Sequence, residues 1–172
     1  MAKEKTIWQV IKYTLVGMLA SIVSFGLLNI LIRLPQVTEL FATPFKSFVF
    51  DYPVVKNAAG QVVSGGLGYF IAFNTANVLA QVVAFFINRD KTFKSSANIA
   101  VTLPIYLAFT LALISFSAWF SPKVNEFVLG KVIFSTEIGK GLAANIANIA
   151  VSVIQFFAYF PVSKILFRKP KQ

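Results

Sequence analysis

Ala72 to Phe86 reads AFNTANVLAQVVAFF, and Ala143 to Phe157 reads AANIANIAVSVIQFF. Seven of the fifteen aligned positions are identical, among them the Asn-x-x-Asn pair and the closing Phe-Phe. Polar side chains inside a membrane helix are costly unless they are paired. The repeat therefore predicts two related membrane-spanning segments, each with a polar face turned towards the interior of the protein.

The composition of the whole chain agrees with a membrane protein. Of the 172 residues, 57% are hydrophobic and 13% are charged, whereas soluble domains are about 45–50% apolar and about 25% charged. The chain has no cysteine and no histidine, which excludes disulfides and removes the commonest metal ligand and general base. The net charge of +10 is better explained by anionic lipid headgroups and the positive-inside rule than by nucleic acid.

Four apolar runs are long enough to cross a bilayer. They predict an all-α integral membrane protein, organised as one domain over residues 1–172, with spans at about 13–32, 68–87, 99–120 and 142–163. The third span is expected to end at Ser121-Pro122. An outer loop of residues 33–67 connects the first two spans.

The charged residues give the orientation of these spans. The two termini and the loop after the second span together hold ten basic and two acidic residues, whereas the other side holds six basic and four acidic residues. The excess of positive charge predicts that both termini are cytoplasmic. The repeated segment then occurs twice in the same direction, which predicts a parallel duplication of a two-helix hairpin.

The outer loop is long and aromatic. Thr43-Pro44 is expected to open a short helix at the membrane interface, and the segment Val54 to Val63 is typical of a short hairpin. A connector lying on the membrane is favoured over a lid that covers a substrate.

Two polar stripes follow from the helical spacing of the repeat, because residues three or four apart share one face of a helix. The stripes consist of Asn74, Asn77 and Gln81 in the second span and Asn145, Asn148, Ser152 and Gln155 in the fourth. Two interpretations stay open: hydrogen bonding between helices, and a polar groove for the hydroxyl groups of a sugar.

The end of the second span is a candidate phosphate site. Arg89 offers a two-pronged guanidinium, Lys91 adds charge, and Asn88 and Lys12 lie at the same level of the predicted membrane. No acidic residue lies centrally in an apolar run, and the chain lacks a Gly-rich phosphate loop. The sequence therefore predicts no enzyme activity, no metal and no cofactor, and it disfavours a proton-coupled drug exporter.

The element Phe85-Phe86-Ile87-Asn88-Arg89-Asp90-Lys91-Thr92-Phe93, together with the four short spans and the opening of the first span, resembles the GtrA-like family. The resemblance rests on the pattern Phe-x-x-Asn-Arg-x-x-x-Phe and implies a role in bacterial cell-surface polysaccharide glycosylation. The fourth span departs from the pattern, because it ends without an Asn-Arg pair.

The resemblance implies a flippase for an undecaprenyl-phosphate-linked monosaccharide, located in the bacterial cytoplasmic membrane beside a polyprenyl-phosphate glycosyltransferase. The alternative is a non-transporting scaffold that holds such a glycosyltransferase. Membrane lipids are expected partners in both cases and nucleic acid in neither. Small-residue faces on the second and fourth spans would also serve a homo-oligomer.

Overall fold

A computed structural model describes residues 2–128, 131–133, 136–137 and 140–168; the side chains of residues 2–6, 122, 125, 132–133, 136–137, 140–145 and 147–148 lie outside this description. Four long helices make up most of the chain: α1 (Ala2–Leu31), α3 (Gly66–Ile87), α4 (Ile99–Val128) and α5 (Lys140–Leu166). Each contains a stretch long and apolar enough to cross a membrane. The chain is a mostly helical, multi-pass membrane protein, as its sequence predicts.

The helices are longer than the apolar runs that predict them. α1 begins well before residue 13, and α4 continues as a helix beyond the predicted end of the third span at Ser121-Pro122, through to Val128. Both helices have 30 residues, about 45 Å of helix against a hydrocarbon core of about 30 Å. An apolar run indicates only the part of a helix that lies inside lipid, and the helix can continue beyond it. Membrane helices also tolerate proline, so Pro122 need not end α4.

The outer loop is folded. It contains α2 (Pro35–Thr38), a 3₁₀ turn η1 (Glu39–Ala42) and four strands, β1 (Phe45–Ser47), β2 (Phe50–Tyr52), β3 (Val54–Lys56) and β4 (Val62–Gly65). The predicted hairpin at Val54 to Val63 is confirmed, with Val54 opposite Gly65. The helix expected to open at Thr43-Pro44 is wrong, because the helical turns come earlier and Pro35, not Pro44, occupies the first helical position.

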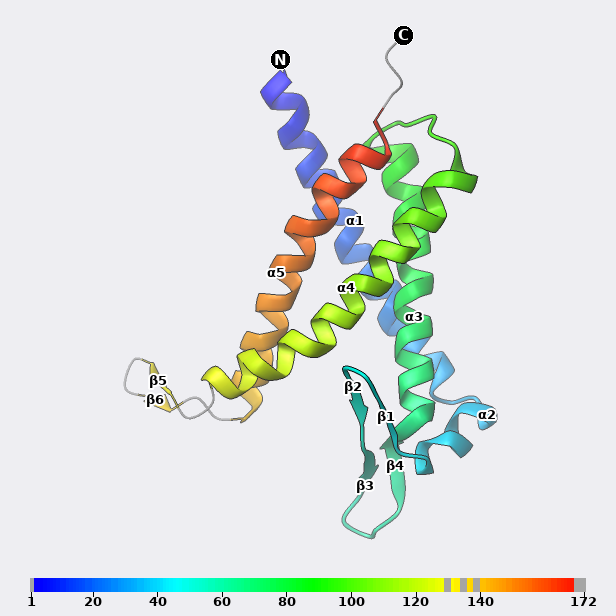
Figure 1. The fold of residues 1–172 in the computed structure, drawn as a ribbon, viewed down its shortest axis with the longest axis vertical. Coiled ribbons are helices and arrows are strands. Elements are labelled where there is room, and N and C mark those ends of the chain that lie inside the picture. Colours follow the sequence, from blue (N-terminus) through cyan, green and yellow to red (C-terminus); the bar gives the residue numbers. More distant parts are fainter. Residues whose placement is uncertain (1, 129–130, 134–135, 138–139, 169–172) are drawn as a thin grey trace.

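Two helical pairs form the membrane part. α1 packs along α3, and α4 packs along α5. The start of α1 and the end of α5 lie at one end of the molecule, called here the terminal end, and strands β1 to β4 lie at the opposite end, called the loop end (Figure 1). The two pairs splay apart towards the loop end (Figure 1). A further short hairpin, β5 (Val132–Ile133) with β6 (Thr136–Glu137), connects α4 to α5.

The α1–α3 pair is held together by alanines. Ala72, Ala76, Ala80 and Ala84 recur every four residues along α3 and are at most 4% exposed. Ala80 and Ala84 pack against Val16 and Ala20 of α1. Small side chains let helix backbones approach closely in a membrane, where packing replaces the hydrophobic effect as the attraction between helices.

Gly66 fastens the outer loop to the start of α3. It has a φ of +57°, and a Cβ placed there would collide with the carbonyl oxygens of Thr43 and Phe41. The next residue, Leu67, donates its N–H to the Thr43 oxygen at 2.7 Å. Only glycine allows this conformation and this approach at low cost, so the backbone of the outer loop packs closely against the start of α3.

Aromatic side chains join the two pairs towards the terminal end. This aromatic cluster consists of Tyr13, Phe85, Phe93, Tyr106, Tyr159 and Phe167, all less than 9% exposed. Tyr13 of α1 lies edge-on to Phe160 of α5, with ring centroids 5.3 Å apart. The cluster packs the two pairs against each other towards the terminal end.

Candidate functional site

A cavity of about 370 Å³, called here the central cavity, lies between α3, α4 and α5. Its wall combines aromatic, aliphatic and small polar side chains: Phe50, Tyr52, Phe73, Asn77, Gln81, Thr110, Ile114, Ser117, Ala118, Ser121, Val151, Ser152, Gln155 and Tyr159. None of these side chains carries a formal charge at neutral pH. The cavity therefore suits a neutral group rich in hydrogen-bonding atoms.

The two predicted polar stripes meet in this cavity. Asn77 and Gln81 reach it from α3, and Ser152 and Gln155 reach it from α5. Gln81 and Ser152 occupy the same position in the two copies of the repeat. Asn74 does not line the cavity, and the side chains of Asn145 and Asn148 lie outside the described residues.

Asn74 misses the cavity because its amide turns back to its own helix. Its Nδ2 donates to the Phe70 carbonyl oxygen at 2.8 Å. Burial raises the pKa of the Tyr52 hydroxyl above its ordinary value, and the nearby Asn74 side chain offsets part of this rise. Tyr52 therefore stays protonated and neutral at the edge of the cavity.

The cavity amides connect the helices to one another. Asn77 accepts a hydrogen bond from Ser24 of α1 at 3.0 Å, Gln81 accepts one from Tyr106 of α4 at 2.9 Å, and Gln155 donates one to Ser117 of α4 at 2.8 Å. Among the described residues, the other end of each amide makes no hydrogen bond. The same side chains thus pack the bundle and keep donors and acceptors available to a ligand.

The outer loop forms part of the cavity wall. Phe50 and Tyr52 of β2 line it, and Phe45, Phe50 and Tyr52 all pack on Phe70 of α3, with ring centroids 4.2 to 5.3 Å apart. The sequence favoured a simple membrane connector for this loop. Two of its aromatic side chains line the cavity, a position that a lid requires and that a connector also allows.

A second pocket of about 280 Å³, called here the lateral pocket, lies between α1 and α5. It shares Gln81, Ser152, Gln155 and Tyr159 with the central cavity. From these residues it extends towards the terminal end, where it reaches Thr14 and Asn88. Its wall includes Met18, which is 61% exposed and faces the surrounding lipid. The lateral pocket therefore adjoins the central cavity and reaches the end of α3, with walls of mixed polar and apolar side chains.

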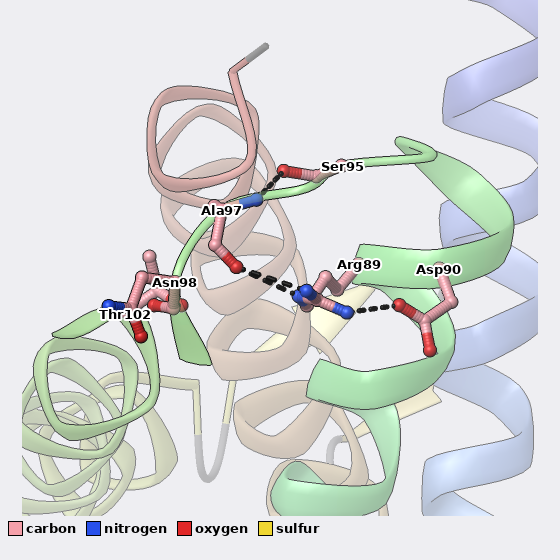
Figure 2. Close-up of polar contacts among 6 residues, drawn as sticks. All are labelled: Arg89, Asp90, Ser95, Ala97, Asn98 and Thr102. Carbon is pink, nitrogen blue, oxygen red and sulfur yellow. Dashed lines mark hydrogen bonds and ion pairs between the residues drawn. The ribbon is translucent and has the colours of Figure 1, made fainter. Parts of the chain in front are cut away.

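Arg89 is held inside the protein by three hydrogen bonds. It lies in a five-residue π-helical turn, η2 (Asn88–Thr92), that follows α3. Figure 2 shows its guanidinium turned to the Ala97 carbonyl oxygen, to which Nε and Nη2 donate at 3.2 and 3.1 Å, while Nη1 pairs with Asp90 at 2.6 Å. The side chain is 18% exposed. Three of its five N–H donors are thus engaged, and two of them close the turn between residues 89 and 97.

The structure does not bring the four residues of the predicted phosphate site together. Lys12 and Lys91 line one open groove between α1 and η2, called here the basic groove, together with Leu15, Val16, Asp90, Thr92 and Lys94. Asn88 is 2% exposed, accepts a hydrogen bond from Thr92 at 3.0 Å and lines the lateral pocket. Arg89 lines neither the groove nor the two pockets.

Several cavity residues were missed by the sequence analysis. Thr110, Ser117 and Ser121 of α4 line the central cavity at intervals of seven and four residues, which place them on one face of a helix. This small polar stripe was visible in the sequence, but it lies outside the repeat. Tyr159 and the aromatic residues of β2 carried no signal, because nothing in their spacing relates them to the amides.

No protein-family model, curated protein or solved structure matches the chain.

Proposed function

We propose that the protein moves an undecaprenyl-phosphate-linked monosaccharide from the cytoplasmic to the outer leaflet of a bacterial cytoplasmic membrane. The observation that carries the proposal is the central cavity, which brings Asn77 and Gln81 together with Ser152 and Gln155 at membrane depth. The lipid-linked substrate class comes from the resemblance of residues 85–93 to the GtrA-like family. A polyprenyl-phosphate glycosyltransferase would supply this substrate on the cytoplasmic side.

The size and chemistry of the cavity support a single sugar as its occupant. A volume of about 370 Å³ is near the lower limit of small-molecule pockets, which span roughly 300–1,000 Å³. Amide and hydroxyl groups can donate to and accept from sugar hydroxyls, and each such bond replaces a bond to water that the sugar loses on leaving the surface. Movement would run downhill, driven by consumption of the sugar on the outer side.

The lateral pocket gives a place to the lipid tail. A polyprenyl chain is apolar and loses nothing by remaining in the bilayer while its sugar follows a polar route. The lateral pocket reaches from Asn88 to Gln155 and faces lipid between α1 and α5, so the headgroup and the tail need not separate. The charge distribution of the chain favours a cytoplasmic terminal end, and the substrate would enter there.

The experiment is translocation of undecaprenyl-phosphate-glucose by the purified chain in liposomes. Gln81→Leu combined with Gln155→Leu removes two cavity amides, and Asn29→Leu serves as a matched control because Asn29 donates only to the Phe25 carbonyl of its own helix. We expect about a tenfold slower rate for the double variant, since each lost hydrogen bond is worth roughly 0.5–1.5 kcal/mol, and an unchanged rate for the control. Equal rates in wild type and double variant, with both folded, would overturn the proposal.

One observation favours the scaffold as a second candidate. Asn77, Gln81 and Gln155 each have an interhelical partner, and pure packing would require no more than this. A scaffold would move no lipid in liposomes without its glycosyltransferase, whereas a flippase would. Absence of translocation by well-folded wild type, followed by capture of the glycosyltransferase in a binding assay, would favour this second candidate.

A further inference from the structure

The basic groove brings together three lysines from two separate segments. Lys12 comes from α1, Lys91 from η2 and Lys94 from the turn that follows, and all three are exposed. Lys94 has a φ of +49°, a left-handed conformation that is unfavourable for a non-glycine residue. Strained positions of this kind often serve a binding site. Here the strained residue is one of the three cations in the groove.

Hydrogen bonds across the turn hold Lys94 in this conformation. The Ser95 N–H donates to the Arg89 carbonyl oxygen at 2.8 Å, and the Arg89 guanidinium donates to the Ala97 carbonyl oxygen. Lys91 and Lys94 both lie within the closed segment. The groove is therefore built by the fold, and its lysines are more than flanking charges on a flexible tail.

The charge of the groove depends on Arg89 although Arg89 does not line it. Among the described residues that line the groove, Asp90 carries the only carboxylate, and its Oδ1 is paired with Arg89 Nη1 at 2.6 Å. Because this carboxylate is already neutralised, the three lysines present their positive charge to an external anion.

The other wall of the groove is apolar. Leu15 and Val16 of α1 line it next to Lys12, and Leu15 is 60% exposed on a helix that crosses the membrane. A free anion would gain nothing from these side chains, whereas a lipid would place its chain along them.

We propose that the basic groove binds the phosphate of an anionic lipid through Lys12, Lys91 and Lys94, with the lipid chain along Leu15 and Val16. Arg89 is a positioning residue that keeps Asp90 away from the lysines and does not contact the phosphate. The identity of the lipid as the transported substrate rests on the proposed function; binding itself rests on the groove alone.

Lipid retention tests this site. The purified full chain is equilibrated with undecaprenyl phosphate, and bound lipid is measured by native mass spectrometry. Lysine near a membrane contributes about fivefold in affinity per residue, so the triple variant K12Q/K91Q/K94Q is expected to retain the lipid about a hundredfold more weakly. The matched control K46Q/K56Q/K123Q removes three exposed lysines outside the groove and should retain it as wild type does.

Three results would overturn the site. Retention of undecaprenyl phosphate by the folded triple variant at the wild-type level would show that the three lysines do not bind the phosphate. Equal retention of undecaprenol by wild type would show that the chain, and not the phosphate, is recognised. Displacement of the lipid by millimolar inorganic phosphate would show that the apolar wall is not used. Normal lipid retention without translocation would count against the proposed function and leave the groove intact.

A charge-balanced pair of variants tests the role of Arg89. Arg89→Gln should weaken retention of undecaprenyl phosphate about fivefold, because Asp90 is then free to pair with the lysines. Adding Asp90→Asn restores the net charge of the wild type and should restore retention. A double variant that stays as weak as Arg89→Gln would mean that Arg89 itself holds the phosphate or acts only on the fold.

Discussion

Replacing Arg89 with lysine should loosen the turn between residues 89 and 97 while keeping its charge. The guanidinium makes two hydrogen bonds to the Ala97 carbonyl oxygen and one to Asp90, whereas an ammonium on a flexible stem cannot reproduce this fork. Lysine would still reach one of the two partners.

The expected cost follows from the bonds that are lost. A hydrogen bond from a charged donor is worth roughly 1.5–3 kcal/mol. The Asp90 pair contributes less, about 0–1 kcal/mol, because the Asp90 side chain is 51% exposed. The two bonds to Ala97 share one carbonyl oxygen and are counted here as one strong interaction. Its loss with retention of the weak pair gives about 2 kcal/mol for opening the turn, which corresponds to about a thirtyfold increase in the open population.

Amide hydrogen exchange in detergent or nanodiscs measures this opening directly. The Ser95 and Ala97 amides donate to Arg89 O and Ser95 Oγ, so both should exchange about thirtyfold faster in Arg89→Lys. Arg33→Lys is the matched control, because Arg33 is exposed at the loop end. Exchange within about threefold of wild type at both amides would refute the assignment of Arg89 to this turn.

Three further substitutions test the packing of the bundle. Phe85→Ala removes a fully buried ring whose centroid lies 5.3 Å from that of Tyr106 and 5.1 Å from that of Phe167. The variant should lower the free energy of unfolding in mixed micelles by about 3–5 kcal/mol. A loss below about 1 kcal/mol would contradict the place of Phe85 in the core. Ala80→Leu overpacks the α1–α3 interface and should cost about 1–3 kcal/mol in the same assay, while Val83→Leu on the exposed side of α3 should be neutral. Gly66→Ala should accelerate proteolysis of the outer loop, because the added Cβ would collide with two carbonyl oxygens. In the control Gly60→Ala the added Cβ meets no neighbour, and the variant should cost only about 1–2 kcal/mol of local strain. Equal cleavage of the two variants would contradict the packing of the loop on α3.

The membrane helices could be predicted because their signal is local. An apolar run reports directly on burial in lipid, and the four runs correspond to α1, α3, α4 and α5. Helix ends could not be predicted in the same way, because the backbone continues its hydrogen bonds beyond the lipid. The residues of α4 beyond Ser121 are helical for this reason, with Pro122 among them.

The sequence predicts those residues of the candidate site whose position follows from helical spacing alone. Asn77 and Gln81 lie on the cavity face, as their separation of four residues indicates. Asn74 shares the spacing but bonds the Phe70 carbonyl, a local competition that spacing cannot reveal. Arg89 and Ala97 meet only because a π-helical turn follows α3, and neither hydropathy nor residue spacing in the sequence indicates such a turn.

The alanines of α3 have a consequence for motion. The alanine methyl groups on the α3 side of this interface have no rotamers to rearrange, so a shift of α1 together with α3 needs less repacking there than a shift of one helix along the other. Between the α1–α3 pair and the α4–α5 pair the contacts are mainly rings, such as Tyr13 with Phe160 and Phe85 with Tyr106, which can turn about χ1 and χ2. Alternating access would accordingly take the form of rocking about the aromatic cluster, with that cluster as the pivot and both helical pairs internally unchanged.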